Sequence, residues 1–174
     1  FVSAAIYYPD VSGATVDFKN IHEDDQGLFG APIVVGDTLY FSPADFKVAT
    51  AGAGGFDYLD GSLQVLLDAK DGFDIDSIEL EEFGDYFLDG IGTTATNVKV
   101  IAQAQITILE VEGTPITPIV QPGTAVYSPA GGVYDLVNHG PDVYDYNEML
   151  WELEVKFDID AILAAKGYGP KEKA

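Results

Sequence analysis

The 174-residue chain is predicted to be all-β: a two-sheet antiparallel β-sandwich, jelly-roll-like, with one short helix near its C-terminus. Apolar and polar residues alternate with a period of two in several runs, as they do in strands that bury one face. Turn-forming Asp-Gly and Gly-Gly pairs separate these runs at the spacing of short strands joined by tight connections. The length fits a single domain, so residues 1–174 are expected to form one.

Each predicted strand places its apolar residues on one face. In chain order, the strands are expected within residues 14–20, 37–43, 61–70, 76–82, 97–113 and 150–160. The last is the clearest, because its apolar residues alternate with charged ones; they are Trp151, Leu153, Val155, Phe157 and Ile159. In the strand within 97–113 the alternation changes near Leu109 to Val111, which predicts a bulge or a bend.

Three other segments complete the predicted fold. Prolines at 115, 118 and 122 favour an extended edge segment or a crossing between sheets, since each proline removes a ladder donor. Residues 127–148 are rich in Tyr, Pro, Gly and Asp and are expected to form a long surface excursion. A short helix is expected within 160–169, capped by Asp158 or Asp160 and ended by Gly167.

Composition excludes several classes of function. The 8 basic residues are all Lys, against 29 Asp plus Glu and a net charge of -21, so the chain should repel polyanions and bind no nucleic acid. Because there is no Cys, disulfide scaffolds, zinc-thiolate sites and thiol catalysis are excluded. No apolar run approaches the length of a membrane-spanning helix, so no transmembrane segment is expected.

Four phrases, taken together, resemble exported bacterial proteins of the PEP-CTERM group, which carry a C-terminal Pro-Glu-Pro sorting signal. They are VDFKNIHEDDQGLFGAPIVVGDTLYFSPADF, GGFDYLDGSLQVLLDAKDGFDIDSIELEEFGDY, QITILEVEG and LEVKFDIDAILAAKGYG. The resemblance implies a secreted or surface-displayed β-rich protein of a bacterium that makes extracellular polysaccharide. The 174 residues contain no Pro-Glu-Pro motif, and no catalytic or binding residues follow from the resemblance.

Calcium is the first candidate ligand, because the chain is rich in carboxylate oxygens, which are hard ligands. One predicted cluster lies around a glycine turn and consists of Asp68, Asp71, Asp74 and Asp76. A second combines three neighbours with two residues of another loop: Glu23, Asp24 and Asp25 with Asp57 and Asp60. The spacing of the first cluster does not fit an EF-hand, and the alternative for each cluster is a solvated acidic turn.

Carbohydrate is the second candidate ligand, because exposed aromatic rings beside Asp and Asn can stack on sugars. The candidate rings are Tyr127, Tyr134, Tyr144 and Tyr146. Alternatively, these side chains hold the long excursion against the sandwich. Glu81, Glu82 and Asp85 offer carboxylate pairs for glycoside hydrolysis, but such pairs arise by chance in so acidic a chain. His22 and His139 are expected to be surface loop residues.

These observations predict a non-enzymatic extracellular, cell-surface or matrix protein of a polysaccharide-producing bacterium, with a structural or adhesive role. Calcium is expected to stabilise it, and exposed strand edges are expected to support self-association. The alternative function is that of a calcium-dependent carbohydrate-binding module. The expected partners are other copies of the chain or extracellular polysaccharide.

Overall fold

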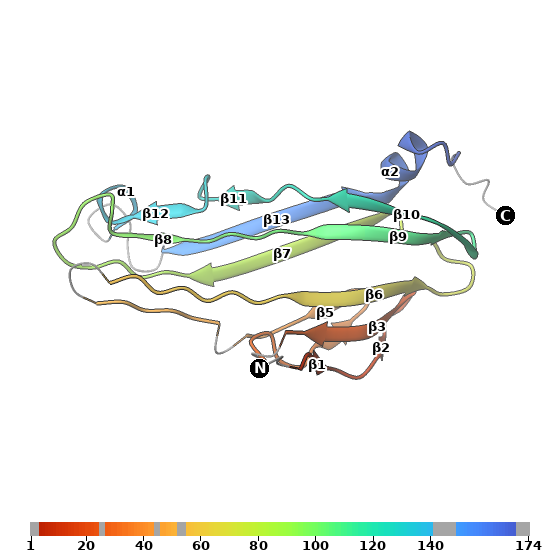
Figure 1. Ribbon diagram of the computed structural model, residues 1–174, viewed down its shortest axis with the longest axis horizontal. Helices are drawn as coiled ribbons and strands as arrows, with labels where there is room; N and C mark the ends of the chain where they lie inside the picture. Colours follow the sequence, from red (N-terminus) through yellow and green to blue (C-terminus); the bar gives the residue numbers. More distant parts are fainter. Residues whose placement is uncertain (1–3, 25–26, 44–45, 52–54, 141–148, 170–174) are drawn as a thin grey trace. The chain divides into compact units, whose positions relative to one another are not determined.

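The computed structural model describes residues 4–24, 27–43, 46–51, 55–140 and 149–169, and the chain divides into two compact units (Figure 1). The first unit spans Phe1–Ile75 and the second Asp76–Ala174. Every strand pairing in the described ranges is antiparallel, and the only helices found there are two short ones. The predicted all-β class with a short C-terminal helix is therefore confirmed. The single domain stays a prediction, and the two units are described separately below.

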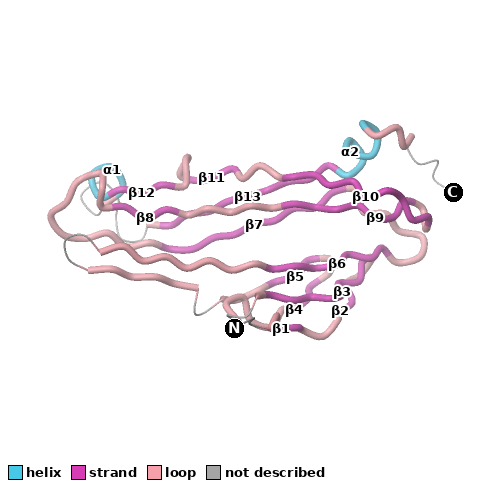
Figure 2. The backbone as a smooth tube through the Cα atoms, in the orientation of Figure 1, coloured by secondary structure: helices cyan, strands magenta, loops and turns pink. Residues whose placement is uncertain are grey.

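The first unit is built around one long strand, β3 (Figure 2). β6 pairs with one edge of β3, while β1 and β2 pair one after the other along its second edge. β4 and β5 form a separate hairpin. The bounds are β1 (Ile6–Tyr7), β2 (Val11–Ser12), β3 (Val16–Glu23), β4 (Ile33–Val35), β5 (Thr38–Tyr40) and β6 (Leu63–Ala69).

A bulge in β3 determines which of its side chains are buried. Val16 and Phe18 point into the core, as the alternation predicts, but Asn20 has a left-handed φ of 48°. The register with β6 shifts at this point, between Lys19 and His22. An extra residue in a strand reverses the alternation beyond it. Ile21 and Glu23 are therefore the residues that turn inward, and both are buried.

The second unit contains three small antiparallel sheets among the residues that the structure describes. β13 is the central strand of one sheet, between β7 and β11, while β9 pairs with β10 and β8 pairs with β12. The bounds are β7 (Ser77–Asp85), β8 (Asn97–Lys99), β9 (Gln105–Val111), β10 (Thr114–Pro122), β11 (Val126–Ser128), β12 (Val133–Asp135) and β13 (Leu150–Asp158).

The strand predicted most clearly, β13, has the expected two faces. Leu153, Val155 and Phe157 are buried, and the intervening residues lie toward solvent. Near its start, Trp151 lies opposite Gly84 of β7, where a Cβ atom would approach the indole ring to 2.7 Å. Trp151 also packs against a buried cluster formed by Tyr86, Leu88, Tyr134 and Met149.

The predicted C-terminal helix is confirmed as α2 (Ile159–Ala165). The carboxylate of Asp158 caps it by accepting a hydrogen bond from the Ala161 amide at 2.8 Å, and Gly167 follows its end with a φ of 88°. No helix in the described ranges is both long and apolar enough to cross a membrane.

The connection predicted as a long excursion is more regular than expected. Its first half forms β11, β12 and the short helix α1 (Leu136–His139), and residues 141–148 lie outside the described ranges. The alternation of β9 changes near Leu109 as predicted, because Leu109 and Glu110 are both exposed, but the extra residues of the register shift lie on β10, between Pro115 and Ile119. The proline-rich segment is β10 itself, where it forms an extended strand paired with β9.

Candidate functional site

One face of the β7–β13 pair carries a concentration of carboxylates, here called the acidic face. Its charged members alternate with the apolar residues of the same strands and are Glu79, Glu81, Asp85, Glu152, Glu154, Lys156 and Asp158. Glu154 lies directly opposite Glu81 across the ladder, and Lys156 lies opposite Glu79. Like charges at directly opposite positions destabilise a sheet, so a cation bound to this face would relieve the repulsion between its carboxylates.

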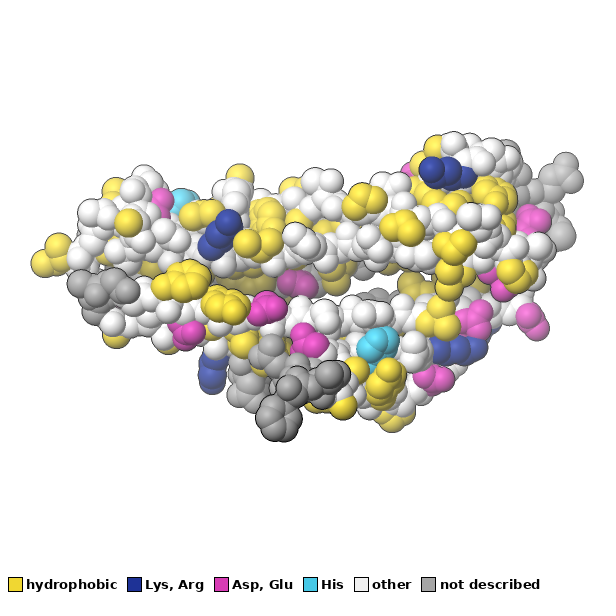
Figure 3. Space-filling view, in the orientation of Figure 1, with side chains coloured by type: hydrophobic (Ala, Val, Ile, Leu, Met, Phe, Trp, Pro, Cys, Tyr) yellow, Lys and Arg dark blue, Asp and Glu magenta, His cyan; other side chains and the backbone are white. Residues whose placement is uncertain are grey.

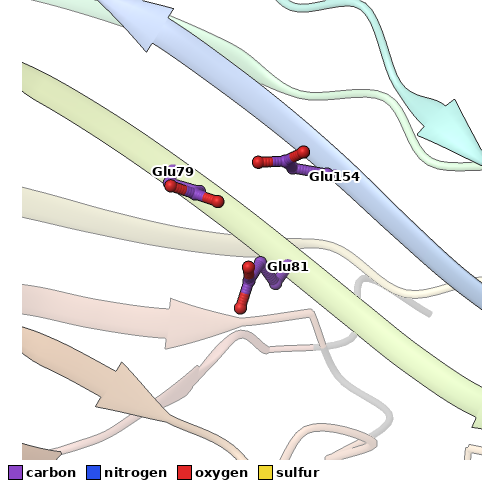
Figure 4. A group of neighbouring side chains, drawn as sticks. All are labelled: Glu79, Glu81 and Glu154. Carbon is purple, nitrogen blue, oxygen red and sulfur yellow. The ribbon is translucent and has the colours of Figure 1, made fainter.

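Three carboxylates of the acidic face converge. Glu79, Glu81 and Glu154 each offer an oxygen, and these oxygens lie within 4.8 Å of one another (Figure 4). No other three acidic or imidazole side chains in the described ranges meet this condition. Carboxylates at this separation could bind a divalent cation such as calcium through oxygen ligands.

Lys156 already supplies one positive charge to this group. Its ammonium forms ion pairs with Glu154 and with Glu79, the latter at 3.2 Å. The hydrogen bonds to Glu154 and Glu79 raise the pKa of Lys156 above its ordinary value. A divalent cation at this position would therefore compete with the Lys156 ammonium for the same oxygens.

The first cluster predicted from the sequence is distributed differently. Asp68 lies on β6, exposed, and forms an ion pair with Lys19 of β3. Asp71 and Asp74 are exposed in the connection that follows β6, and Asp76 is the first residue of the second unit. The structure does not bring them together as a three-carboxylate group, so calcium binding at these residues stays a prediction.

The second predicted cluster contains a carboxylate with a structural role. Glu23 is only 1% exposed and accepts hydrogen bonds from the Tyr8 hydroxyl and from the amides of Phe29 (2.9 Å) and Gly30 (3.3 Å). Burial, followed by this hydrogen bond to Glu23, raises the pKa of Tyr8 to about 12. Both oxygens of Glu23 therefore have donors from the protein, because the β3 bulge directs the side chain inward.

The other members of this cluster lie at the surface or outside the described residues. Asp24 joins the end of β3 to Ser62, whose amide donates to the carboxylate at 2.8 Å. Asp57 and Asp60 are exposed, and Asp57 accepts a hydrogen bond from the amide of Tyr58. Asp25 lies outside the described ranges.

The candidate sugar-binding tyrosines do not form an exposed platform where the structure describes them. Tyr134 is fully buried and stacks on Tyr86, with ring centroids 4.7 Å apart, so its face is not available to a sugar. Tyr127 is half-buried, and its hydroxyl accepts a hydrogen bond from the Ala102 amide. Tyr144 and Tyr146 lie outside the described residues.

An exposed aromatic pair lies elsewhere, in the first unit. Phe56 and Tyr58 are 86% and 70% exposed, and their rings stack with centroids 6.1 Å apart. These two rings were not predicted as a site, although Phe-x-Tyr in an extended segment places both rings on one side. Of the two histidines, His22 stacks on Tyr7, whereas His139 is half-buried with its ring edge-on to Tyr134.

The carboxylates considered for hydrolysis lie on opposite faces of β7. Glu81 and Asp85 belong to the acidic face, whereas Glu82 lies on the inner face opposite Leu153. Burial raises the pKa of Glu82 above its ordinary value of 4.5. Glu82 and its neighbours therefore do not converge on one point, as paired acid-base catalysis would require.

The raised pKa of Glu82 leads to a testable pH dependence. The folded state disfavours the ionised carboxylate, so Glu82→Gln is expected to increase the free energy of unfolding at pH 7.5. The increase should shrink as the pH falls toward 4.5, where the carboxyl of the unfolded chain is half protonated, and should be lost below that pH. Urea unfolding at both pH values measures it, with Glu110→Gln, at an exposed position outside the acidic face, as the control. An equal gain at both pH values would contradict the assignment to charge burial.

Charge is unevenly distributed along the second unit. Residues 90–134, which include β8 to β11 and β12 without its last residue, Asp135, contain one Lys and two Glu, a net charge of -1 out of the total of -21. In Figure 3, hydrophobic and neutral atoms accordingly predominate over the strip that Figure 1 assigns to β8 and β9. The unit thus combines an acidic face on β7 and β13 with a nearly neutral group of strands.

Comparison of the chain with protein-family models, characterised proteins and solved structures finds no match. Function is therefore inferred from the acidic face, the neutral strands and the exposed aromatic pair.

Proposed function

We propose that this chain is a non-enzymatic, extracellular or cell-surface structural protein of a polysaccharide-producing bacterium, and that calcium stabilises it. The proposal rests mainly on the convergence of Glu79, Glu81 and Glu154 on the acidic face. Exported bacterial proteins of the PEP-CTERM group, which the sequence resembles, support the proposed location.

A calcium-containing exterior suits the electrostatics of this chain. At a net charge of -21 the folded state repels itself, and part of that repulsion acts directly between Glu81 and Glu154 across one ladder. A bound divalent cation adds positive charge where Glu79, Glu81 and Glu154 converge. It would release the Lys156 ammonium to the remaining carboxylates of the face.

Calcium is expected to raise the thermal unfolding midpoint at fixed ionic strength by several degrees more than magnesium does. A ligand at 100 times its dissociation constant stabilises the folded state by about 2.7 kcal/mol, which corresponds to a shift of that order for a domain of this size. Magnesium is the control because its small, rigid coordination shell suits an exposed carboxylate group poorly. The measurement is circular dichroism during heating, with either ion at millimolar concentration.

Two variants test whether the calcium-dependent shift in the unfolding midpoint originates at the acidic face. Glu81→Gln should abolish most of the difference between calcium and magnesium, whereas Glu110→Gln, which makes the same change outside the acidic face, should preserve it. Asp71→Asn tests the cluster predicted from the sequence in the same assay. Equal and small effects of both ions on the parent protein would reject calcium stabilisation and leave the carboxylates as a solvated surface.

The second candidate is a calcium-dependent carbohydrate-binding module, and the exposed pair of Phe56 and Tyr58 favours it. Exposed aromatic rings can stack on the apolar faces of sugars. This function predicts that soluble polysaccharide adds a further increase in the unfolding midpoint when calcium is present. A structural role predicts the calcium shift alone.

A further inference from the structure

The strand path over residues 97–111, here called the neutral edge, has an unpaired side. It comprises β8, a connecting stretch and β9. On one side it pairs with β12 and β10. Within the described ranges, no strand pairs with its other side. A strand edge of this length is a template for β-sheet extension by another chain.

The backbone direction shows which residues of the neutral edge face outward. The Val100 amide donates to Gly132 at 2.8 Å, and the Ala104 carbonyl accepts from Gly123 at 2.8 Å. Even-numbered residues of this stretch therefore direct their backbone groups toward the neighbouring strand. Because successive residues of a strand point to opposite sides, the odd-numbered ones direct N–H and C=O to the open side. Those residues are Lys99, Ile101, Gln103, Gln105 and Thr107.

Protective features common at strand edges are largely missing here. Prolines at 115, 118 and 122 remove donors from β10, but the neutral edge contains no proline. Between Lys99 and Glu110 it has no charged residue, and Ile101 is 64% exposed. Proteins ordinarily protect such edges with charge, proline or a covering segment.

We propose that the neutral edge pairs antiparallel with the same edge of a second copy of this chain, around a twofold axis at Ala104. This inference rests on the proposed structural role and identifies the partner as the protein itself. The sequence is self-complementary about that point. Gln103 of one copy would face Gln105 of the other, Ile101 would face Thr107, and Val100 would face Ile108.

This register agrees with the backbone directions. Gln103 and Gln105 point N–H and C=O outward, so they would form the hydrogen-bonded pairs on either side of the axis. Ala104 would form the non-hydrogen-bonded pair on the axis, where its small side chain allows close approach. The two Gln residues of each copy would lie side by side and could exchange amide hydrogen bonds, as in Gln ladders.

Charge also favours a second copy at this edge. Two copies of net charge -21 repel each other over most of their surfaces. Residues 90–134 carry a net charge of only -1, so contact through this region brings few like charges together. Opposite the ends of the paired stretch, Lys99 would lie near Leu109 and Glu110 of the other copy.

The absence of native Cys allows a direct test by cross-linking. Under mild oxidation in calcium-free buffer, Ala104→Cys is expected to form a disulfide-linked dimer, because non-hydrogen-bonded partners in antiparallel strands lie about 4.5 Å apart between Cα atoms. Gln64→Cys, at an exposed position on β6, is the matched control and should cross-link at least tenfold more slowly. Equal rates for the two variants would overturn the proposal. Circular dichroism checks that each variant is folded.

A second variant tests association without a cross-link. Gln103→Lys combined with Gln105→Lys lowers the net negative charge of each copy, so general electrostatics would strengthen association. In the proposed register the introduced ammonium groups face one another, and the dimer dissociation constant should rise at least tenfold. Gln64→Lys combined with Thr38→Lys is the control with the same charge change. Sedimentation velocity measures both, and tighter association of the edge variant would overturn the proposal.

These outcomes are separable from failure of the proposed function. A calcium-dependent midpoint shift without preferential Ala104→Cys cross-linking would reject the edge pairing and preserve the structural role. Cross-linking without a calcium shift would support the pairing and reject calcium stabilisation.

Discussion

Replacement of Glu23 by alanine is expected to reduce the free energy of unfolding of the first unit by about 3 kcal/mol. Glu23 is buried on the inner face of β3, where its carboxylate accepts three hydrogen bonds. Alanine would leave the amides of Phe29 and Gly30 and the Tyr8 hydroxyl without this acceptor. Each buried donor that loses its partner costs about 1–3 kcal/mol, although partial hydration reduces the sum.

Two milder variants separate hydrogen bonding from side-chain volume. Glu23→Gln keeps the shape, but one donor would face an amide NH₂, so we expect about half of the alanine effect. Tyr8→Phe removes only one of the three donors and should cost about 1 kcal/mol. Asp57→Ala, at an exposed position, is the control and should be nearly neutral.

The measurement is urea unfolding combined with hydrogen exchange of the β3 backbone amides. Loss of the Glu23 carboxylate should speed amide hydrogen exchange in β3 and in the segment that contains Phe29 more than it does in β13. If Glu23→Ala unfolds at the same urea concentration as Asp57→Ala, the buried carboxylate does not stabilise this unit.

The alternation of residues was sufficient to predict β13 and the helix after it. Leu153, Val155 and Phe157 are buried as expected, and Asp158 caps α2. In this part of the chain the alternation of apolar and polar residues agrees with the local structure, and no bulge interrupts the period of two in β13. Where this consistency holds, a single sequence is enough to place the element and its buried face.

The role of Glu23 could not be predicted, because it depends on one backbone irregularity. The alternation places Val16 and Phe18 inside, and continuing it would leave Glu23 exposed. Asn20 adopts a left-handed conformation, and the strand beyond it is reversed. Asn is among the few residues that tolerate this conformation, which was the available signal.

The acidic face was missed for a different reason. The sequence shows that Glu79 and Glu81 share one side of a strand and that Glu154 lies on the outer side of another. It does not show that these strands are neighbours, or that Glu154 pairs with Glu81. Sequence reasoning therefore favoured carboxylates close together in the chain, such as Asp71 and Asp74. The converging group instead joins residues separated by more than half of the second unit.

Tyr134→Ala is expected to destabilise the second unit by about 3–5 kcal/mol, as truncation of a buried aromatic side chain ordinarily does. The ring has no exposed surface, and it stacks on Tyr86 at an interplanar angle of 8°. Its removal would leave a cavity next to Leu88 and Met149 in the cluster that supports Trp151. A sugar-binding tyrosine at the surface would give the opposite result, with little change in stability.

The matched variant Tyr134→Phe removes only the hydroxyl, so it separates the contribution of the hydroxyl to stability from that of the ring. The hydroxyl donates only a long hydrogen bond of 3.5 Å to the Pro129 carbonyl, so Tyr134→Phe should cost less than about 1 kcal/mol. Trp151 is the single Trp of the chain and packs against the same cluster, so its fluorescence during urea unfolding reports this region directly. Similar losses for alanine and phenylalanine would mean that the hydroxyl, and not ring packing, stabilises the cluster. A loss only for alanine would assign Tyr134 to the core and exclude it from any surface that binds polysaccharide.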